Sequence, residues 1–335
     1  MDKKWRNIIR YGFWGAVAVL LVWLCLRAVD WAAFREALRL CRWGWVLVSM
    51  LLGVLVLYVR GLRWRMLLQP IDPSTRTLTC FNAYNICMAV NLAIPRAGEL
   101  VRIGYVMKHS ARNASGERKL SADKVLGVVV AERSWDAVIT LAMSAVLLLA
   151  KWEDFGVQTF DSLSGIFSRT GLWLLLGGLV VAGVGFLLLC WFLRERGGLW
   201  GRIWGFVRGI GSGLGSFRHM RGGWLFLLYT ALIWIFYWLQ VCCIIWALQA
   251  IPDFAPLTLT DGFFLMIAGC LSSVVPVPGG FGAYHGVVAW SLSAIWGIPL
   301  GTGIIFATLS HESQTLAHAL CGLASYLNET FVRKK

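Results

Sequence analysis

Long apolar stretches, separated by short polar and basic segments, run along almost the whole chain. One apolar run begins near residue 10 and ends at about Val29, and five more cover residues 44–59, 125–150, 171–193, 223–250 and 302–327. A helix needs roughly 20 residues to cross a bilayer, which the second run reaches only if it extends through residues 66–68. We expect about six transmembrane helices, the first uncleaved because no small-x-small cleavage site follows it.

Two other apolar stretches are interrupted in a similar way. NLAIPRAGELVR at residues 91–102 and SSVVPVPGGFGAYHG at residues 272–286 each combine proline, glycine and polar or ionisable residues. Lipid provides no partner for the backbone groups that such breaks expose, so irregular backbone at membrane depth lines a binding site or a cavity. The two breaks therefore indicate a transporter-like protein.

Basic residues in the connecting segments predict the orientation of the helices. Lys and Arg accumulate in residues 1–10, 60–65, 96–124, 194–221 and 333–335, whereas residues 151–169 and 251–261 are acidic or nearly neutral. Because basic loops stay on the cytoplasmic side, we expect both termini there. The segment 30–43 should then lie outside although it holds three arginines. AAFREALRL within it has helical periodicity, so we expect it to lie in the interface plane.

This orientation constrains the two interrupted stretches. Residues 60 and 124 are both expected inside, so residues 78–96 must enter the membrane and return, and residues 262–301 must do the same from outside. The chain then divides into two oppositely oriented halves, each made of two helices, a re-entrant hairpin and a helix, at about 10–150 and 171–327. The expected fold is an all-α polytopic membrane protein, a single domain over residues 1–335 arranged as an inverted repeat, with no soluble domain.

Composition agrees with a membrane protein. Hydrophobic residues make up 58% of the chain and charged residues 14%, and the mean hydropathy is +0.69. The net charge of +14 comes from short loops and no recognisable basic fold is present, so no nucleic-acid partner is expected. Nine cysteines lack C-x-x-C spacing and are typical of packing residues. No Walker loop, dinucleotide fingerprint or G-x-S-x-G motif occurs, so we expect no cofactor.

The first break brings ionisable groups to membrane depth. Pro95 suits the first position of a helix, where its missing N–H is harmless. Arg96, Glu99 and Arg102 follow at three-residue steps along one face. A helix N-terminus with either arginine suits a phosphate group. The alternative is a mutually neutralised trio that anchors the hairpin.

Three more charges interrupt the span at 125–150. Glu132 and Asp136 are one helical turn apart, and Arg133 lies beside Glu132. Charges at that depth need partners. Either the two acids pair with hairpin arginines or relay a proton, or the three residues form a structural ion-pair network between two helices.

The second break has a backbone suited to close approach. Prolines in PVPGG at 276–280 fix φ, and the glycines there and at position 282 allow positive φ, so the chain can turn sharply beside a ligand. His285 follows this turn.

The last span carries a polar stripe. In SHESQTLAH, His311, Gln314 or Thr315, and His318 share one helix face, which should point into the protein. The zinc motif H-E-x-x-H is not met because residue 315 is Thr. Two interpretations stay open: the side chains assemble a metal or proton site, or they are buried hydrogen-bonded polar groups. The residues concerned are His285, His311, Glu312 and His318.

Three motif blocks, in this order, resemble the lysylphosphatidylglycerol synthase transmembrane-region family, also described as flippase-like integral membrane proteins. The blocks are NLAIPRAGELVR, AERSWD and VPVPGGFGAYH, carried by Asn91, Pro95, Gly98, Glu99, Arg102, Glu132, Arg133, Asp136, Pro276, Pro278, Gly279, Gly280 and Gly282. One departure is His285, where many members carry an acidic residue. In the fused synthases a separate carboxyl-terminal domain performs aminoacyl transfer. Because this chain ends at Lys335, we expect it not to be the synthase and not to be an enzyme.

The resemblance implies movement of a polar-headed phospholipid or lipid-linked sugar across the bacterial cytoplasmic membrane. The implied partners are membrane lipids and enzymes of lipid modification or envelope synthesis. Arg96 and Arg102 are the expected headgroup contacts, and the other candidate binding residues are those of the three blocks with His285, His311, Glu312, Gln314 and His318. Two other classes stay open: a membrane-embedded transferase or subunit that uses histidines on a lipid-linked substrate, and a scaffold without transport.

Overall fold

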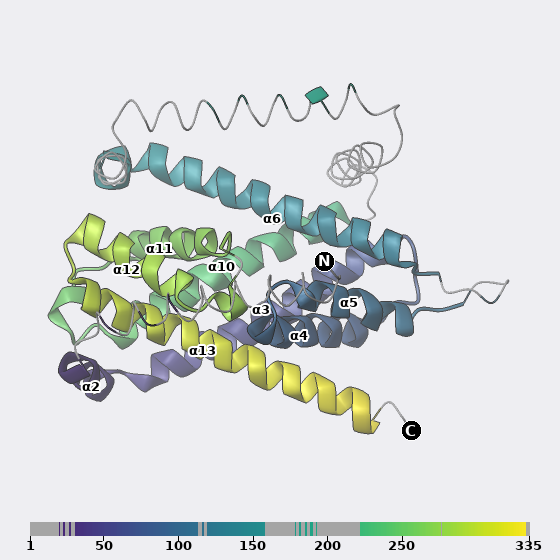
Figure 1. The fold of residues 1–335 in the computed structure, drawn as a ribbon, viewed down its shortest axis with the longest axis horizontal. Coiled ribbons are helices and arrows are strands. Elements are labelled where there is room, and N and C mark those ends of the chain that lie inside the picture. Colours follow the sequence, from purple (N-terminus) through teal and green to yellow (C-terminus); the bar gives the residue numbers. More distant parts are fainter. Residues whose placement is uncertain are drawn as a thin grey trace, which may run out of the picture. The chain divides into compact units, whose positions relative to one another are not determined.

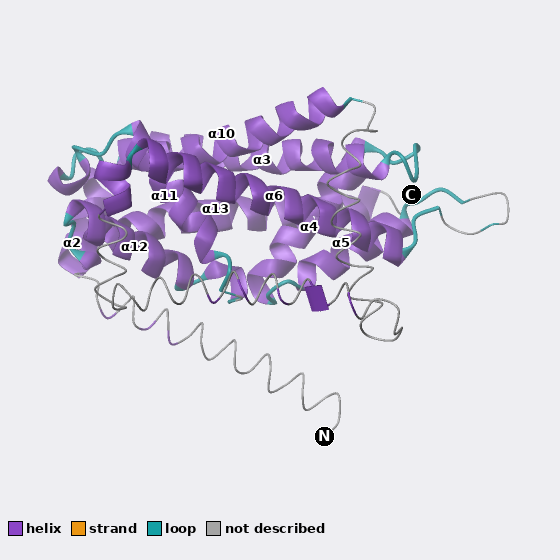
Figure 2. Cartoon of the chain, turned by 90° about the horizontal axis from the view of Figure 1, so that it is seen from above, coloured by secondary structure: helices purple, strands orange, loops and turns teal. Residues whose placement is uncertain are grey.

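The computed structural model describes residues 31–112, 116, 119–157, 222–275 and 277–332, with isolated positions between 20 and 27 and between 178 and 192. These residues form helices and turns, and no strand runs through them (Figure 2). The all-α fold class predicted from the sequence is confirmed. The expected spans at about 10–29 and 171–193 lie outside the described residues.

Two compact units make up the chain. One contains residues 1–122 and 224–335, and the other contains residues 123–223. Helix α6 (Ala122–Ala150) is the long helix of the second unit. The helices of the first unit are α2 (Trp31–Leu40), α3 (Trp43–Leu68), α4 (Thr77–Ala93), α5 (Ala97–Lys108), α10 (Gly223–Ala247), α11 (Leu259–Ser272), α12 (Ala283–Trp296) and α13 (Leu300–Leu327) (Figure 1).

The long helices follow from uninterrupted apolar sequence. α3, α6 and α10 are each long and apolar enough to cross a membrane. The second span, expected at residues 44–59 and long enough only if it reached residues 66–68, continues to Leu68 as α3. α13 has 28 residues and is also long enough, although its Ser, Thr, His and Gln residues make it more polar than the other three.

The order of elements recurs along the chain. α3 is followed by the broken pair α4 and α5 and then by α6, and α10 is followed by the broken pair α11 and α12 and then by α13. Each half was predicted to contain two helices, a re-entrant hairpin and a helix, and the described residues show the last three of these positions as a helix, a broken pair and a helix. The re-entrant course of the broken pairs stays a prediction. The opposite orientation of the halves, and the interfacial position of the amphipathic helix α2, stay predictions.

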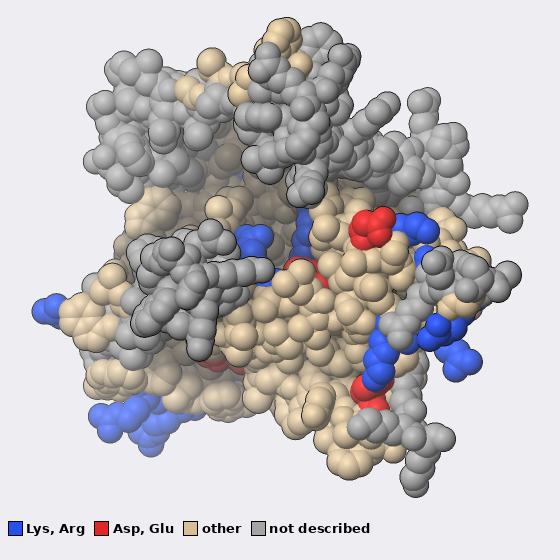
Figure 3. Space-filling view, turned by 45° about the vertical axis from the view of Figure 1, so that its right-hand side comes forward, with Lys and Arg blue, Asp and Glu red and all other residues tan. Residues whose placement is uncertain are grey.

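The outer faces of the long helices carry exposed leucines. Leu51 and Leu55 on α3, and Leu316, Leu320 and Leu323 on α13, are each about half exposed or more. On the face shown in Figure 3, most of the described surface is neither acidic nor basic, and the charged atoms gather in separate groups. An apolar surface of this extent suits contact with lipid.

Helix α13 is the centre of the first unit. It packs against α3, α4 and α12, and also contacts α2 (Figure 1). Small residues allow the close approach: Gly303 faces Ala289 of α12, and Gly322 faces Ala89 of α4. Helices in lipid depend on such packing because lipid chains are as apolar as the side chains they would replace. The polar side of α13 is thereby held inside the protein.

The first break is a chain reversal at Arg96. α4 ends at Ala93 and α5 begins at Ala97, with Arg96 as the N-cap residue at φ 60°. The prediction that Pro95 opens the helix is wrong, because the reversal uses a left-handed residue after the proline and α5 starts beyond it.

A side chain and a glycine then hold α4 and α5 together. The Gly98 N–H donates to Asn91 Oδ1 at 2.8 Å. A Cβ atom at Gly98 would overlap the carbonyl oxygen of Cys87 on α4. Only glycine therefore allows the two helices to lie this close.

Three glycines with positive φ form the second break. Gly279, Gly280 and Gly282 have φ of 58°, 80° and 79° between the end of α11 and the start of α12. The predicted sharp turn is confirmed for the described residues, and Pro276 lies outside them. The short helical turn Pro278–Gly280 contacts α4, and a Cβ atom at Gly279 would lie 3.5 Å from the Cα atom of Leu92. The two breaks therefore meet within the first unit.

Asp72 ties the loop after α3 to the end of α5. Its buried carboxylate accepts hydrogen bonds from the Ser74 hydroxyl and N–H, from the Ser110 hydroxyl at 2.8 Å and from the Ala111 N–H at 3.0 Å. Burial by itself opposes ionisation, but these bonds outweigh it and hold the pKa of Asp72 below its ordinary value.

Gly98→Ala is expected to destabilise the protein by about 1–3 kcal/mol, because the new methyl group forces α4 and α5 apart. Thermal unfolding of the purified protein in detergent measures the effect. Gly104→Ala on the same helix is the matched control: nothing lies within 4 Å of its Cβ position, so a gain of up to about 1 kcal/mol in helix propensity is expected. Equal unfolding temperatures for the two variants would contradict the close packing.

Asp72→Asn is expected to destabilise the protein near neutral pH by about 2 kcal/mol. Because the folded pKa is lowered, the ionised carboxylate stabilises the fold above the unfolded pKa, and this contribution disappears as the pH falls through the folded pKa. The unfolding temperatures of wild type and variant, measured as a function of pH, should therefore converge in acid. A difference that stays constant with pH would show that charge is not the cause.

Candidate functional site

Three arginines are buried among the described residues of the first unit. Arg60 and Arg63 lie one turn apart on α3, and Arg102 lies on α5. Arg60 donates from Nε to the Tyr237 hydroxyl at 3.0 Å and from Nη1 to the Tyr84 hydroxyl at 2.9 Å. Charge inside a membrane protein needs partners of this kind, and here they join α3 to α4 and α10.

Arg102 is both paired and stacked. Its Nη2 atom lies 2.8 Å from Glu99 Oε2, and its guanidinium lies 4.4 Å from the Trp64 ring centroid and 4.8 Å from that of Tyr84. Of the predicted trio, the structure brings Glu99 and Arg102 together, while Arg96 is exposed in the turn. A planar guanidinium suits this position because it can stack and form an ion pair at once.

The first backbone N–H groups of α5, which an anion would need as donors, already make hydrogen bonds within the protein. The Ala97 N–H donates to the Ile94 carbonyl at 3.2 Å, and the Gly98 N–H is taken by Asn91. Of the two arginines expected to hold a headgroup, Arg96 is exposed and Arg102 is buried. In this conformation the first break is a stabilised turn, and headgroup binding by the two arginines stays a prediction.

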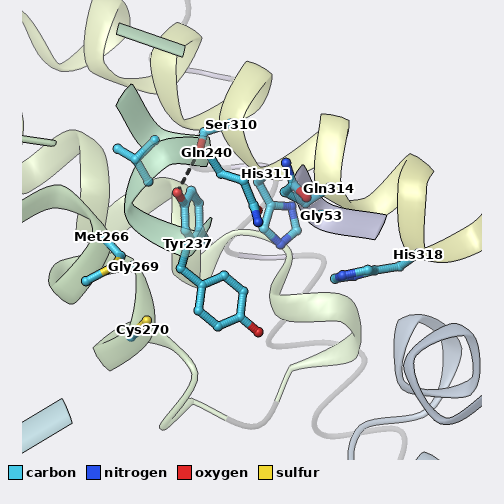
Figure 4. Close-up of a pocket in the computed structure, with 12 residues that line it drawn as sticks. Gly53, Tyr237, Gln240, Met266, Gly269, Cys270, Ser310, His311, Gln314 and His318 are labelled. Carbon is cyan, nitrogen blue, oxygen red and sulfur yellow. Dashed lines mark hydrogen bonds between the residues drawn. The ribbon is translucent and has the colours of Figure 1, made fainter. Parts of the chain in front are cut away.

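A cavity of about 160 Å³ lies among α3, α10, α11, α12 and α13. Figure 4 shows Gln240, His311 and Gln314 close to one another, with His318 further along α13. The predicted inward face of His311, Gln314 and His318 is confirmed. The lining consists of Gly53, Tyr237, Gln240, Val241, Met266, Gly269, Cys270, Tyr284, Ser310, His311, Gln314 and His318.

Hydrogen bonds fix part of the polar lining. Gln314 Nε2 donates to the backbone oxygen and hydroxyl of Ser49 at 3.1 and 2.9 Å, and the hydroxyls of Tyr284 and Ser310 are 2.9 Å apart. The buried atoms Gln314 Oε1 and Gln240 Nε2 have no hydrogen-bond partner among the described residues. Because a buried polar atom without a partner is costly, these two side chains favour a polar ligand.

His285, His311 and Glu312 meet at the second break. His311 Nε2 lies 2.9 Å from the Gly279 carbonyl oxygen, and its Nδ1 lies 3.0 Å from Glu312 Oε1. His285 Nε2 lies 3.5 Å from the same carboxylate oxygen. Three of the four residues expected to assemble are therefore together, while His318 lies two turns along α13 and lines the cavity.

The charged residues of the middle motif lie on α6. This helix, with Glu132, Arg133 and Asp136, belongs to the second unit. Their pairing with the hairpin arginines, or with each other as a network between helices, stays a prediction.

Several site residues escaped the sequence analysis. Arg60 and Arg63 were expected in a loop after the second span, and this position is wrong because α3 extends past them and buries them. Their one-turn spacing in an extended apolar span was the missed signal. The partners Tyr84 and Tyr237 had no such signal, since aromatic residues are abundant in this chain.

The cysteines behave as packing residues. Cys41, Cys80, Cys87, Cys242 and Cys243 are buried, and burial alone raises the pKa of Cys41, which lies between α2 and α3. Cys25 and Cys190 lie outside the described residues.

The fold and cavity define an all-α membrane protein whose interior holds polar and charged groups. The family model described as the lysylphosphatidylglycerol synthase TM region matches residues 13–322. The chain therefore belongs to this family, and the resemblance carried by the three motif blocks is confirmed. It is an integral membrane protein of a family linked to lipid handling. Comparisons with curated proteins and with solved structures gave no match.

Arg102→Lys is expected to lower stability by about 1–3 kcal/mol, because lysine keeps the charge but loses the stacking on Trp64 and Tyr84. Arg39→Lys on the exposed side of α2 is the control, with no measurable change expected. Thermal unfolding in detergent measures both. Equal stability of the two variants would contradict a structural role for the stack.

Proposed function

We propose that this protein moves a polar-headed lipid with an anionic, phosphate-bearing headgroup across the membrane. The headgroup passes through the polar cavity while the acyl chains stay in the bilayer. The observation that carries the proposal is the cavity itself, which lies beside the second break and has two unpartnered buried amide atoms in its lining. Broken helices at such positions are typical of transport sites.

The size of the cavity suits a headgroup and not a whole lipid. A volume of about 160 Å³ accommodates several water-sized groups, since one water occupies about 30 Å³ in the liquid. The lining supplies donors and acceptors from Gln240, Gln314 and Ser310. This combination favours a compact, hydrogen-bonding headgroup.

Arg60 supplies positive charge next to the cavity. Its Nε atom donates to the hydroxyl of Tyr237, which is a lining residue. Surroundings of low dielectric strengthen the attraction between this charge and an anion. We assign Arg60 to electrostatic attraction of the headgroup, and we assign to Arg96 and Arg102 contacts that form when the first break rearranges.

The membrane arrangement is part of the proposal. We place the chain in the bacterial cytoplasmic membrane with both termini in the cytoplasm, the pair α4 and α5 opening inward and the pair α11 and α12 opening outward. Basic loops support this orientation. The contact between the two breaks supports hairpins that enter from opposite sides. Glycine hinges at 279–282 would absorb the changes of φ and ψ that alternate access requires.

A membrane-embedded transferase or enzyme subunit acting on a lipid-linked substrate is the second candidate function. The observation that favours it is the cluster of His285, His311 and Glu312, because paired histidines and a carboxylate suit acid–base chemistry. The two candidates differ in whether the lipid is chemically changed. Mass spectrometry of lipids recovered after incubation with the protein separates them.

Movement of fluorescent phospholipids in liposomes tests the transport proposal. Gln240→Leu is the main variant: it removes an unpartnered buried amide, so the fold should be at least as stable, while headgroup movement should slow on the order of tenfold. Ile235→Ala is the control, because this residue is exposed on another face of α10 and its loss should leave the rate unchanged.

Lipids with several headgroups are compared in the same assay. Faster movement of anionic phospholipids by the wild type, together with slowing in Gln240→Leu only, would support the proposal. Equal rates of lipid movement in wild type and Gln240→Leu would show that the headgroup does not pass through the cavity. No movement of any tested lipid, with unchanged lipid by mass spectrometry, would favour a scaffold for lipid-modifying or envelope-synthesis enzymes.

A further inference from the structure

We propose that His285, His311 and Glu312 form a binding site for a divalent transition-metal ion of the zinc type. One ligand atom from each of these residues lies within 4.8 Å of the others. His285 is on α12, directly after the glycine turn, and the other two are consecutive residues of α13. The site therefore connects the second break to the central helix.

The hydrogen bond to Gly279 decides which nitrogen of His311 is available. A backbone carbonyl only accepts, so His311 Nε2 must carry the proton in the 2.9 Å contact with the Gly279 oxygen. In the neutral imidazole, Nδ1 then has a lone pair, and this lone pair points at Glu312 Oε1, 3.0 Å away. Two acceptors at this separation repel unless a positive charge lies between them.

A metal ion accounts for all three residues. Four-coordinate zinc with bonds of about 2.0–2.1 Å keeps its ligand atoms about 3.3 Å apart. The separations of Glu312 Oε1 from His311 Nδ1 and from His285 Nε2, 3.0 and 3.5 Å, lie on either side of this value. A proton on His311 would satisfy only the pair with Glu312, and the approach of His285 to the same oxygen would then need a second proton on His285 Nε2, whereas one metal ion accounts for both contacts.

The surroundings of His311 hold its ring in place. The rings of Phe281, Tyr284 and His285 lie 5.3, 5.0 and 5.3 Å from it, measured between centroids. Metal-binding histidines commonly donate their second N–H to a carbonyl, as His311 does here, which fixes the ring and its tautomer. The Thr315 hydroxyl also lies 3.5 Å from Nδ1.

The arrangement replaces a motif that the sequence lacks. An H-E-x-x-H helix would place its second histidine at position 315, where this chain has threonine. His285 supplies the second imidazole from a different helix instead. Three protein ligands leave a fourth position open, as in zinc sites that bind water or substrate, and His311 also lines the cavity. A phosphate oxygen suits that open position.

Metal analysis of the full-length protein tests the site without any transport assay. Protein freed of its affinity tag, treated with chelator, loaded with Zn²⁺ and desalted is expected to retain a single ion per chain. His285→Ala and Glu312→Gln should retain at least about tenfold less, since each removes one of three ligands. His109→Ala is the matched control, because His109 Nε2 also lies 3.2 Å from a glutamate, Glu329, at the far end of α5.

Cobalt absorption of the wild type provides a second measurement that needs no variant. Co²⁺ bound by two imidazoles and a carboxylate in four-coordinate geometry gives strong visible bands, whereas weak six-coordinate bands would overturn the site. Wild type that retains no zinc, or ligand variants that retain as much as the wild type, would also overturn it. Failure of metal binding would leave the transport proposal standing, and failure of lipid movement would leave the metal site standing, because the measurements are separate.

Discussion

The backbone at the two breaks must find hydrogen-bond partners inside the protein, and the structure of the first unit follows from this constraint. Lipid offers none, so each break uses a side chain in place of the missing helical partner. Asn91 accepts from the Gly98 N–H at the first break. His311 donates to the Gly279 oxygen at the second. The polar side chains at these points therefore stabilise the backbone of the breaks. Only the donor and acceptor atoms that they do not use for this purpose can bind a ligand.

Aromatic side chains, and not only acidic ones, contact the buried arginines. Arg102 has Glu99 as its ion-pair partner, but Trp64 and Tyr84 cover its guanidinium, and Tyr84 also binds Arg60. This arrangement keeps the guanidinium groups charged within packed helices, because ring faces attract cations while adding apolar contact. It also places the positive charge of a buried arginine next to the polar cavity and away from lipid.

The glycines serve the same arrangement by deciding which helices come close. Gly98 allows α5 to lie on α4, and Gly279 allows the second break to reach Leu92. Helices in lipid gain little from hiding apolar surface, so contact at short range has a large share in their association. The meeting of the breaks, the cavity and the histidine cluster all depend on these approaches.

The sequence by itself determined the family, the all-α class, the long apolar helices, both breaks and the inward face of His311, Gln314 and His318. Those features are encoded locally, in hydropathy, helical period and residues that stop a helix. Only the tertiary structure decided which distant groups meet: Gln314 with Ser49, 265 residues apart, and Arg60 with Tyr237, 177 residues apart. Such pairings depend on helix packing and on backbone turns such as the left-handed Arg96, which no local pattern specifies.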